Sequence, residues 1–422
     1  MQRMRRLPAL VMILAGGRGQ RLSPLTDLRA KLAVPFAGRY RLIDFVLSNF
    51  YNSGFRKMCV ATQYKSESLN RHIARSWQIS GFSDEYIACV PAQMRTDGGW
   101  YKGSADAIYQ NLNLIDDEQP ENVFVFGADH IYKMDVDQML RFHTASQADL
   151  TIAAIPVPIA EASQFGVMSV DAHGRLLQFT EKPTQPDPMP GRPDMALASM
   201  GNYIFRTNKL VEVVTADAHS QSEHDFGKNI ITRMLDEFDC YVYDFGSNVI
   251  PGASVKEKAY WRDVGTLEAY FQCNMDLIHT DPVMDLYNPH WPIHTGSTSL
   301  PPSKFVHASE GNRRVGRALD SMVSEGCIIS GGTVQESILS PGVRVNSWSE
   351  LYQCIVYEDC SIGRRAKLRR TIVDKSVHVP EGAVIGYDRD FDRAYFFVSD
   401  EGITVVPKGY DMSLIKSWPS AS

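Results

Sequence analysis

Cysteine is scarce in this sequence, with seven residues, an odd number, and no CxxC pair among them. A disulfide framework or a cysteine-based zinc site is therefore not expected, and the composition fits a reducing, cytoplasmic compartment. Apolar runs are short, and none approaches the ~20 residues that a membrane-spanning helix needs. The net charge is only -6, which argues against a protein that binds nucleic acid through phosphate contacts alone.

The two common phosphate-binding motifs are also missing at the one place where a glycine-rich loop follows an apolar run. The run Leu10 to Ala15 ends in Gly16-Gly17-Arg18-Gly19. The dinucleotide fingerprint needs a glycine three residues after Gly19, where Leu22 stands, and the Gly-Lys-Ser/Thr of the Walker loop is absent. The run itself predicts a buried strand of a parallel sheet.

Glycines after such a strand let backbone N–H groups approach an anion, and Arg21 and Lys31 add positive charge nearby. We therefore predict a loop that holds the phosphates of a nucleoside triphosphate; an ordinary turn is the competing interpretation. The arginines ahead of the run also imitate a signal peptide, but cleavage near Ala15 would remove the strand that carries the loop.

Residues 1–280 alternate apolar strands with helical stretches, which predicts an α/β domain, doubly wound, Rossmann-like, with a mostly parallel sheet. Ligands of such sheets bind beyond the carboxyl ends of the strands, where the glycine-rich loop and Asp129 fall. The expected strands after the first are 57–62, 123–129 and 150–157, and the expected helices are 41–53, 66–79, 104–115 and 136–145.

Residues 281–320 are rich in proline, serine, asparagine and glycine and are interpreted as a connector. Residues 321–422 differ again, because apolar side chains recur every six positions. This period predicts a left-handed parallel β-helix of hexapeptide repeats, a structure that often serves regulation and assembly. The recurring residues are Met322, Ile328 and Val334, then Val356, Ile362 and Leu368, then Val373, Val379 and Ile385.

Two aspartates are candidate metal ligands. Asp129 closes an apolar strand beside the predicted phosphate loop, and Asp263 follows Tyr260-Trp261-Arg262. Magnesium takes oxygen ligands, usually one or two carboxylates with phosphates and water. The alternative for each aspartate is an ordinary turn or helix N-cap.

Three further segments could hold a substrate. Glu181-Lys182 ends another apolar run and could bind a sugar phosphate, although such pairs are usually solvated surface residues. Trp100 to Ala107 brings aromatic side chains beside small ones, which suits a flat base or simply a helix start. The segment from Asp225 to Lys228, which combines acidic and basic residues, does not by itself indicate a function.

Taken in order, these segments closely resemble glucose-1-phosphate adenylyltransferases of the bacterial glycogen-synthesis type. The resemblance runs from about Leu10 to beyond Gly402. Its blocks include LAGGRG at 14–19, YRLIDF at 40–45, WYKG at 100–103, GADHIYK at 127–133, FGVM at 165–168, EKP at 181–183, ASMG at 198–201, HDFGK at 224–228 and YWRDVGT at 260–266.

The resemblance implies adenylyl transfer from ATP to glucose 1-phosphate, with Mg²⁺, in a homotetramer regulated by phosphorylated metabolites. Arg21 and Lys31 would bind the triphosphate together with Gly16, Gly17 and Gly19, and Gln93 and Gly103 would contact adenine. Glucose 1-phosphate would be held by Tyr101, Gly166, Glu181, Lys182, Ser199, Asp225 and Trp261. Asp129, also catalytic, and Asp263 would coordinate the metal, and the effector residues would be Arg29, Arg41 and Lys375.

Several positions depart from the family pattern around this effector site. Leu32 replaces a proline, Leu28 stands where a basic residue is frequent, and Asp117 is acidic where some members are basic. The effector is therefore open. Two alternative functions also remain open: a non-catalytic regulatory subunit of the family, and a nucleotidyltransferase that uses another base or sugar. An acyltransferase based on the β-helix is disfavoured, because it would leave the first 280 residues without a role.

Overall fold

The sheet of the first domain is built around β1 (Ala9–Ala15), which lies between β6 (Asn122–Gly127) and β4 (Lys57–Thr62). The computed structural model describes residues 8–79, 84–93, 99–309 and 314–420. β6, β1, β4 and β5 (Tyr86–Pro91) are mutually parallel. Their carboxyl ends therefore meet at one edge, where the glycine-rich loop leaves β1.

The other half of the sheet is mixed. The long strand β11 (Met195–Arg206) runs antiparallel to β6, β8 (Leu150–Pro158) and β9 (Gly166–Val170). β10 (Leu176–Glu181) pairs antiparallel with β9, and β12 (Cys240–Asp244) pairs parallel with β8. This half brings residues 166, 181 and 199 toward the parallel half.

Helices cover both faces of the sheet, as the doubly wound prediction required. Leu10 and Met12 point into a core shared with α3 (Ser104–Tyr109) and α6 (Thr207–Ala218), while Val11 and Ile13 point into a core shared with α1 (Leu42–Asn52) and α5 (Val136–Ala145). Successive strand residues face opposite sides, so a fully apolar strand needs helices on both faces. The remaining helices are α2 (Glu67–Ser76), α4 (Leu112–Glu118), α7 (Thr232–Met234) and α8 (Leu267–Asp276).

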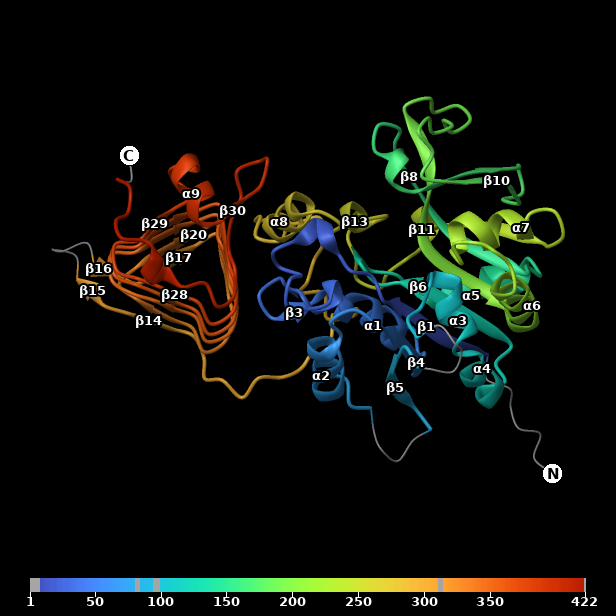
Figure 1. Cartoon of the computed structure of the whole chain (residues 1–422), viewed down its shortest axis with the longest axis horizontal. Helices are drawn as coiled ribbons and strands as arrows, with labels where there is room; N and C mark the ends of the chain where they lie inside the picture. Colours follow the sequence, from blue (N-terminus) through green and yellow to red (C-terminus); the bar gives the residue numbers. More distant parts are fainter. Residues whose placement is uncertain (1–7, 80–83, 94–98, 310–313, 421–422) are drawn as a thin grey trace.

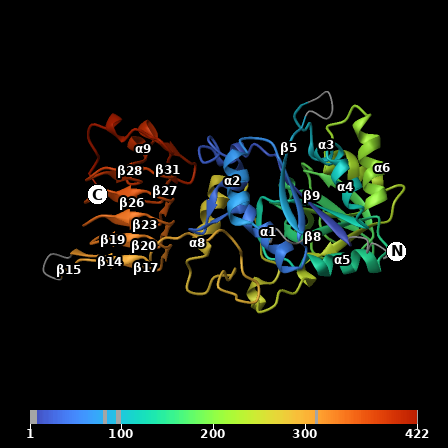
Figure 2. The ribbon, with the colours of Figure 1, turned by 90° about the horizontal axis from the view of Figure 1, so that it is seen from below.

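The described residues after 303 form a parallel β-helix whose short strands stack in three ladders (Figures 1 and 2). In the middle of each ladder, successive partners lie 16 or 17 residues apart, as in Ile328, Arg344, Ser361 and His378. Most of the apolar residues of the six-residue period fill the interior, which confirms the repeat prediction. Its strands include β19 (Ile328–Ser330), β20 (Thr333–Gln335), β24 (Ile355–Val356) and β27 (Thr371–Val373), and α9 (Arg389–Tyr395) lies beside the last coils.

The β-helix begins earlier than the boundary expected at residue 321. β14 (Lys304–Val306) already pairs with β19, and β17 (Arg317–Leu319) with β20. Side chains of this first coil are largely exposed, so its sequence lacks the buried period. Before residue 304, the segment instead runs along α1, where the Asn52 side chain donates to the Pro292 carbonyl oxygen.

The two domains share one apolar core. Ile338, Ile355 and Ile372, from one ladder of the β-helix, belong to the same buried cluster as Phe36 and Phe45 of the first domain. α8 lies at this boundary, and the hydroxyl oxygens of Tyr270 and Tyr357 are 2.7 Å apart (Figure 1). Among the described residues, no helix is both long enough and apolar enough to cross a membrane.

Candidate active site

A pocket of about 350 Å³ opens at the carboxyl ends of the parallel strands. Its wall combines the loop after β1, the end of β4 and the start of α3. The predicted residues that line it are Gly16, Gly17, Lys31, Tyr101, Gly103 and Asp129, and Leu14, Ala15, Leu32, Ala61, Gln63, Ser104 and Ala107 complete the lining.

The glycine-rich loop folds directly onto the segment that carries Lys31. Gly19 has φ +63°, and a Cβ atom placed on it would lie 2.8 Å from the Cβ atom of Lys31. The Thr26 hydroxyl donates to the Gly19 carbonyl oxygen at 2.9 Å. This conformation and this close approach together require glycine at position 19.

Lys31 and Asp129 meet at the floor of the pocket, and Asp263, which lines a neighbouring pocket, lies beside them. The Lys31 Nζ atom lies 2.8 Å from Oδ2 of Asp129 and 4.0 Å from Oδ1 of Asp263. The His130 ring lies between the two carboxylates, with Nδ1 3.5 Å from Asp129 and Nε2 4.0 Å from Asp263. Arg21 lies close to this group. A Cβ atom placed on Gly265 would be within 3 Å of both the Arg21 guanidinium and the Asp263 carboxylate, so these two side chains are neighbours.

Strand pairing explains the convergence. β7 (His130–Tyr132) and β13 (Trp261–Asp263) are antiparallel, and Asp263 is registered with His130. Asp129 immediately precedes β7, so this short ladder brings two aspartates that are far apart in sequence to one place. The Trp261 ring lies over the His130 ring at 4.6 Å between centroids, which fixes the orientation of both.

The charge around Asp129 keeps it ionised. Desolvation alone would raise the pKa of the Asp129 carboxyl, but the charges of Lys31 and His130 and the Lys31 hydrogen bond together lower this pKa below its ordinary value. The Asp129 side chain is 41% exposed, so its oxygens can reach a ligand in the pocket.

This donor set fits magnesium. Two carboxylates beside a phosphate-sized space are what the ion uses when a substrate supplies further oxygens. Within the described ranges no group of three or more His, Cys, Asp or Glu side chains is arranged to hold a metal. A metal at Asp129 and Asp263 therefore needs phosphate and water oxygens to complete its coordination.

One wall of the pocket is held by hydrogen bonds to Tyr101. Its backbone N–H donates to Oε1 of Gln63 at 2.7 Å, and the Asn111 side chain donates to its hydroxyl at 3.0 Å. Gly103 approaches the backbone of residues 223 and 224 so closely that a Cβ atom would lie 2.3 Å from the His224 carbonyl oxygen. The Ser104 hydroxyl donates to Asp225 at 3.1 Å, and Asp225 also accepts from the N–H groups of the turn that follows it.

Of the residues expected to hold the sugar phosphate, Gly166, Glu181 and Ser199 lie on the mixed half of the sheet, outside the lining of the 350 Å³ pocket, whereas Tyr101 lines that pocket. Gly166 and Gly227 both lie against Glu181, whose carboxylate is 3.3 Å from the Lys182 ammonium. Lys182 has φ +47° and a largely exposed side chain. Ser199 is buried in β11, where its hydroxyl accepts from the Gly201 N–H.

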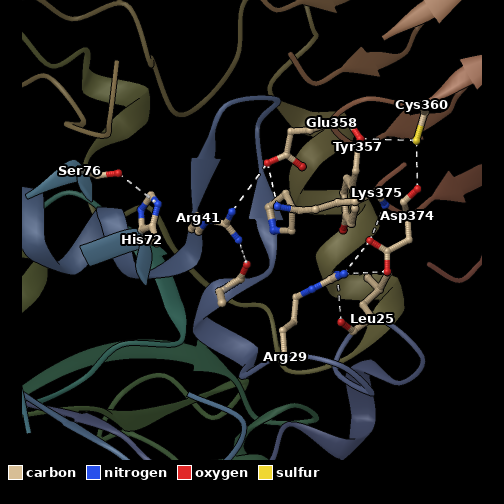
Figure 3. Close-up of polar contacts among 12 residues, drawn as sticks. Leu25, Arg29, Arg41, His72, Ser76, Tyr357, Glu358, Cys360, Asp374 and Lys375 are labelled. Atoms are coloured by element: carbon tan, nitrogen blue, oxygen red, sulfur yellow. Dashed lines mark hydrogen bonds and ion pairs between the residues drawn. The ribbon is translucent and has the colours of Figure 1, made fainter. Parts of the chain in front are cut away.

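Other predicted residues do not line the pocket either: Gly19, Arg21 and Asp263 lie next to it, and two further groups lie elsewhere. Gln93 follows β5 on the exposed edge of the sheet. Arg29, Arg41 and Lys375 instead meet at the domain boundary (Figure 3). There the Arg29 guanidinium contacts both oxygens of Asp374 at 2.8 and 2.9 Å, and Lys375 donates to Glu358 at 2.9 Å.

Sequence reasoning missed His130 and Gln63. Each is a polar residue just beyond the end of a buried strand, which is the one signal that could have singled it out. Their roles depend on partners elsewhere in the chain, Trp261 and Tyr101, which local patterns do not reveal.

Comparisons with known proteins agree with this architecture. Residues 10–280 match the nucleotidyl transferase family, and residues 301–406 match the GlmU-like C-terminal hexapeptide family. The fold and the pocket thus define a nucleotidyltransferase that carries a hexapeptide β-helix.

Relatives that align with this chain over nearly their whole length identify the family within this class. The chain is 57% identical over 401 residues to the glucose-1-phosphate adenylyltransferase of an Anaeromyxobacter species, an alignment that covers 94% of this chain and 98% of the relative. It is 52% identical over 413 residues to the Thermus thermophilus protein of the same name, covering 96% and 99%. The chain belongs to the glucose-1-phosphate adenylyltransferase family.

Proposed function

We propose that this chain transfers the adenylyl group of ATP to α-D-glucose 1-phosphate, giving ADP-glucose and pyrophosphate, the step that supplies the glucosyl donor of glycogen synthesis. The observation that carries the mechanism is the convergence of Lys31, Asp129 and Asp263 at the pocket that begins with the glycine-rich loop. The family membership of the whole chain supports the choice of substrates.

The triphosphate lies along the loop of Gly16, Gly17 and Gly19 in this proposal. Backbone N–H groups approach its oxygens there, and Arg21 and Lys31 neutralise the charge that builds on the departing pyrophosphate. The adenine base contacts Gly103 and Gln93. The sugar phosphate is bound by Lys182, whose side chain is largely exposed and whose ammonium lies 3.3 Å from Glu181. Glu181 accepts hydrogen bonds from the sugar hydroxyls. Tyr101, Gly166, Ser199, Asp225 and Trp261 complete that site.

The reaction is an in-line displacement. An oxygen of the sugar phosphate attacks the α-phosphorus of ATP, the bond from this phosphorus to the bridging oxygen breaks, and that oxygen leaves with the electron pair on pyrophosphate. The protein forms no covalent intermediate, so its contribution is to hold the two anions in line and to balance their charge. Mg²⁺ held by Asp129 and Asp263 supplies further charge neutralisation when it is bound.

Pyrophosphate release tests the proposal directly. We would measure it with glucose 1-phosphate against ATP, UTP, GTP, CTP and dTTP, and then with ATP against other sugar 1-phosphates. A clear preference for ATP and glucose 1-phosphate is expected. Preference for another nucleotide or sugar would replace the substrates, and no release with any pair would indicate a non-catalytic member of the family.

Regulation is proposed at the cluster of Arg29, Arg41 and Lys375. These cations already face Asp374 and Glu358, so a phosphorylated effector has to compete with two carboxylates for them. Asp117, which was expected at this site, instead lies exposed on α4, at the end of the first domain opposite the β-helix, so within one chain it does not face this cluster (Figure 1). Because of the two competing carboxylates, AMP is expected to inhibit weakly, and tight AMP binding by calorimetry would contradict this expectation.

A cytoplasmic homotetramer is the proposed form of the enzyme, on the strength of its family. Light scattering coupled to size-exclusion chromatography measures the mass of the assembly, and a mass other than four chains would contradict the proposal.

A further inference from the structure

Arg29, the cation at the domain boundary, is only two residues before Lys31 of the pocket. Arg29 points out of the first domain and into the β-helix (Figure 3). Lys31 instead points to Asp129. One short segment therefore joins the β-helix to the pocket.

The segment has little freedom to move between these two ends. The N–H of Ala30 donates to the Lys65 carbonyl oxygen at 3.1 Å, and the Ala30 carbonyl oxygen accepts from the N–H of Ala33 at 3.0 Å. Arg29 and Lys31 are themselves 4% and 8% exposed. A displacement of Arg29 is therefore passed on to the backbone of Lys31, because the buried segment between them cannot absorb it.

The β-helix end of the contact is equally fixed. Asp374 directly follows β27, and its backbone N–H donates to the Val406 carbonyl oxygen at 2.9 Å. Its carboxylate accepts the N–H of Lys375 at 2.7 Å and binds the Arg29 guanidinium through both oxygens. Two-point contact of this kind fixes direction as well as distance. The Arg29 guanidinium also donates to the Leu25 carbonyl oxygen at 3.2 Å.

We propose that Asp374 is a positioning residue for adenylyl transfer, which holds the Lys31 ammonium against Asp129 through the buried Arg29–Asp374 pair. The proposal rests on the role given above to Lys31. It assigns the β-helix a direct part in the geometry of the pocket, since the carboxylate that fixes this segment comes from the second domain.

The first test is the Asp374→Asn variant in steady-state assays. Loss of the two-point contact should lower kcat on the order of 10- to 100-fold, the effect that a small misplacement of a reacting group produces. KM for glucose 1-phosphate should change much less than kcat, because Gly166, Glu181 and Ser199, which are assigned to that substrate, lie on the mixed half of the sheet. Asp392→Asn is the matched control, since Asp392 is another buried carboxylate of the second domain whose contacts stay within that domain. Wild-type kcat for Asp374→Asn would overturn the proposal.

A double-mutant cycle with Lys31→Ala separates positioning from general structural support. If Asp374 acts through Lys31, Asp374→Asn should have no further effect on kcat in the Lys31→Ala background, whereas independent effects multiply. Multiplying effects would overturn the positioning role and leave the role of Lys31 intact. Full activity of Lys31→Ala alone would instead overturn the role of Lys31 in the proposed reaction.

A second variant guards against misfolding. Asp374→Asn leaves the Arg29 charge buried without its partner, so we also pair Arg29→Met with Asp374→Leu, which replaces the ion pair by apolar side chains of similar size. This double variant should retain its thermal transition and still show the reduced kcat. Recovery of wild-type kcat would show that filling the space is sufficient and would overturn the proposal.

Discussion

The Lys31 ammonium lies 2.8 Å from the Asp129 carboxylate, although the two residues are 98 positions apart in the chain. This pair balances charge in the pocket and aims both groups at the space beyond the glycine-rich loop. Asp129→Asn keeps the shape of the side chain and removes its charge. We expect kcat to fall about 10²- to 10³-fold, as for loss of one transition-state contact, with an unchanged circular dichroism spectrum and thermal transition.

Asp135→Asn is the control for this prediction. Asp135 is the N-cap of α5, six residues further along, and asparagine caps a helix equally well. Its activity and stability should match the wild type. If Asp129→Asn retained near-full turnover, the catalytic role of Asp129 would be wrong.

We expect the activity to depend on a divalent metal, because the carboxylates of Asp129 and Asp263 lie together beside Lys31. Chelation with EDTA should abolish pyrophosphate release, and added Mg²⁺ should restore it. Asp263→Asn should raise the half-saturating Mg²⁺ concentration at least about tenfold, since one of two protein ligands loses its charge. Asp116→Asn, an exposed carboxylate of α4, serves as the control. Activity that persisted in chelator, or an unchanged Mg²⁺ requirement in Asp263→Asn, would contradict this assignment.

Much of the fold could be predicted because its signals are local. The expected strand 57–62 and helix 136–145 match β4 and α5, since each is a short apolar pattern bounded by polar residues. The helix expected over 104–115 is broken into α3 and α4 instead. At the break, the Asn111 side chain donates to the Ala107 carbonyl oxygen and to the Tyr101 hydroxyl, and such side-chain bonds compete with the helix ladder.

Less of the functional site could be predicted from the sequence. Asp129 and Asp263 could be proposed as partners from the family resemblance, but only the β7–β13 register brings them together. The Arg29–Asp374 pair joins residues 345 positions apart. No periodicity or motif encodes that contact, because it depends on how the β-helix packs against the first domain.

Gly19 offers a test of the phosphate loop. Gly19→Ala forces a side chain into left-handed backbone at a cost of roughly 1–2 kcal/mol, and its Cβ would press on Lys31. We expect KM for ATP to rise about tenfold or more, with a smaller change in KM for glucose 1-phosphate.

The control for this variant is Gly54→Ala. Gly54 also has positive φ, +91°, but its Cβ position is open and it lies at the end of α1, remote from the pocket. Both variants should lose stability in urea unfolding, Gly19→Ala more than Gly54→Ala because of its contact with Lys31, while only Gly19→Ala should lose ATP affinity. Equal KM values for the two variants would show that Gly19 serves folding alone.

Asp392 gives the β-helix a stability that depends on pH. Asp392 lies on α9, and its buried carboxylate accepts the N–H of Gly386 at 2.8 Å. Desolvation raises the pKa of Asp392 from 3.8 to about 6, partly offset by that hydrogen bond. The folded chain therefore binds this proton more tightly than the unfolded chain, and the stabilisation is complete below pH 3.8 and is lost as the pH rises through about 6.

Asp392→Asn should remove this dependence, because asparagine can accept the same hydrogen bond at every pH. The unfolding free energy of wild type minus variant should fall by at most about 3 kcal/mol between pH 4 and pH 7, measured by urea denaturation. Asp171→Asn should show the opposite sign, since backbone N–H groups of Arg175 and His173 lower the pKa of Asp171 and its contribution is lost on acidification. A pH-independent difference for Asp392→Asn would mean that the carboxylate remains ionised in the folded β-helix.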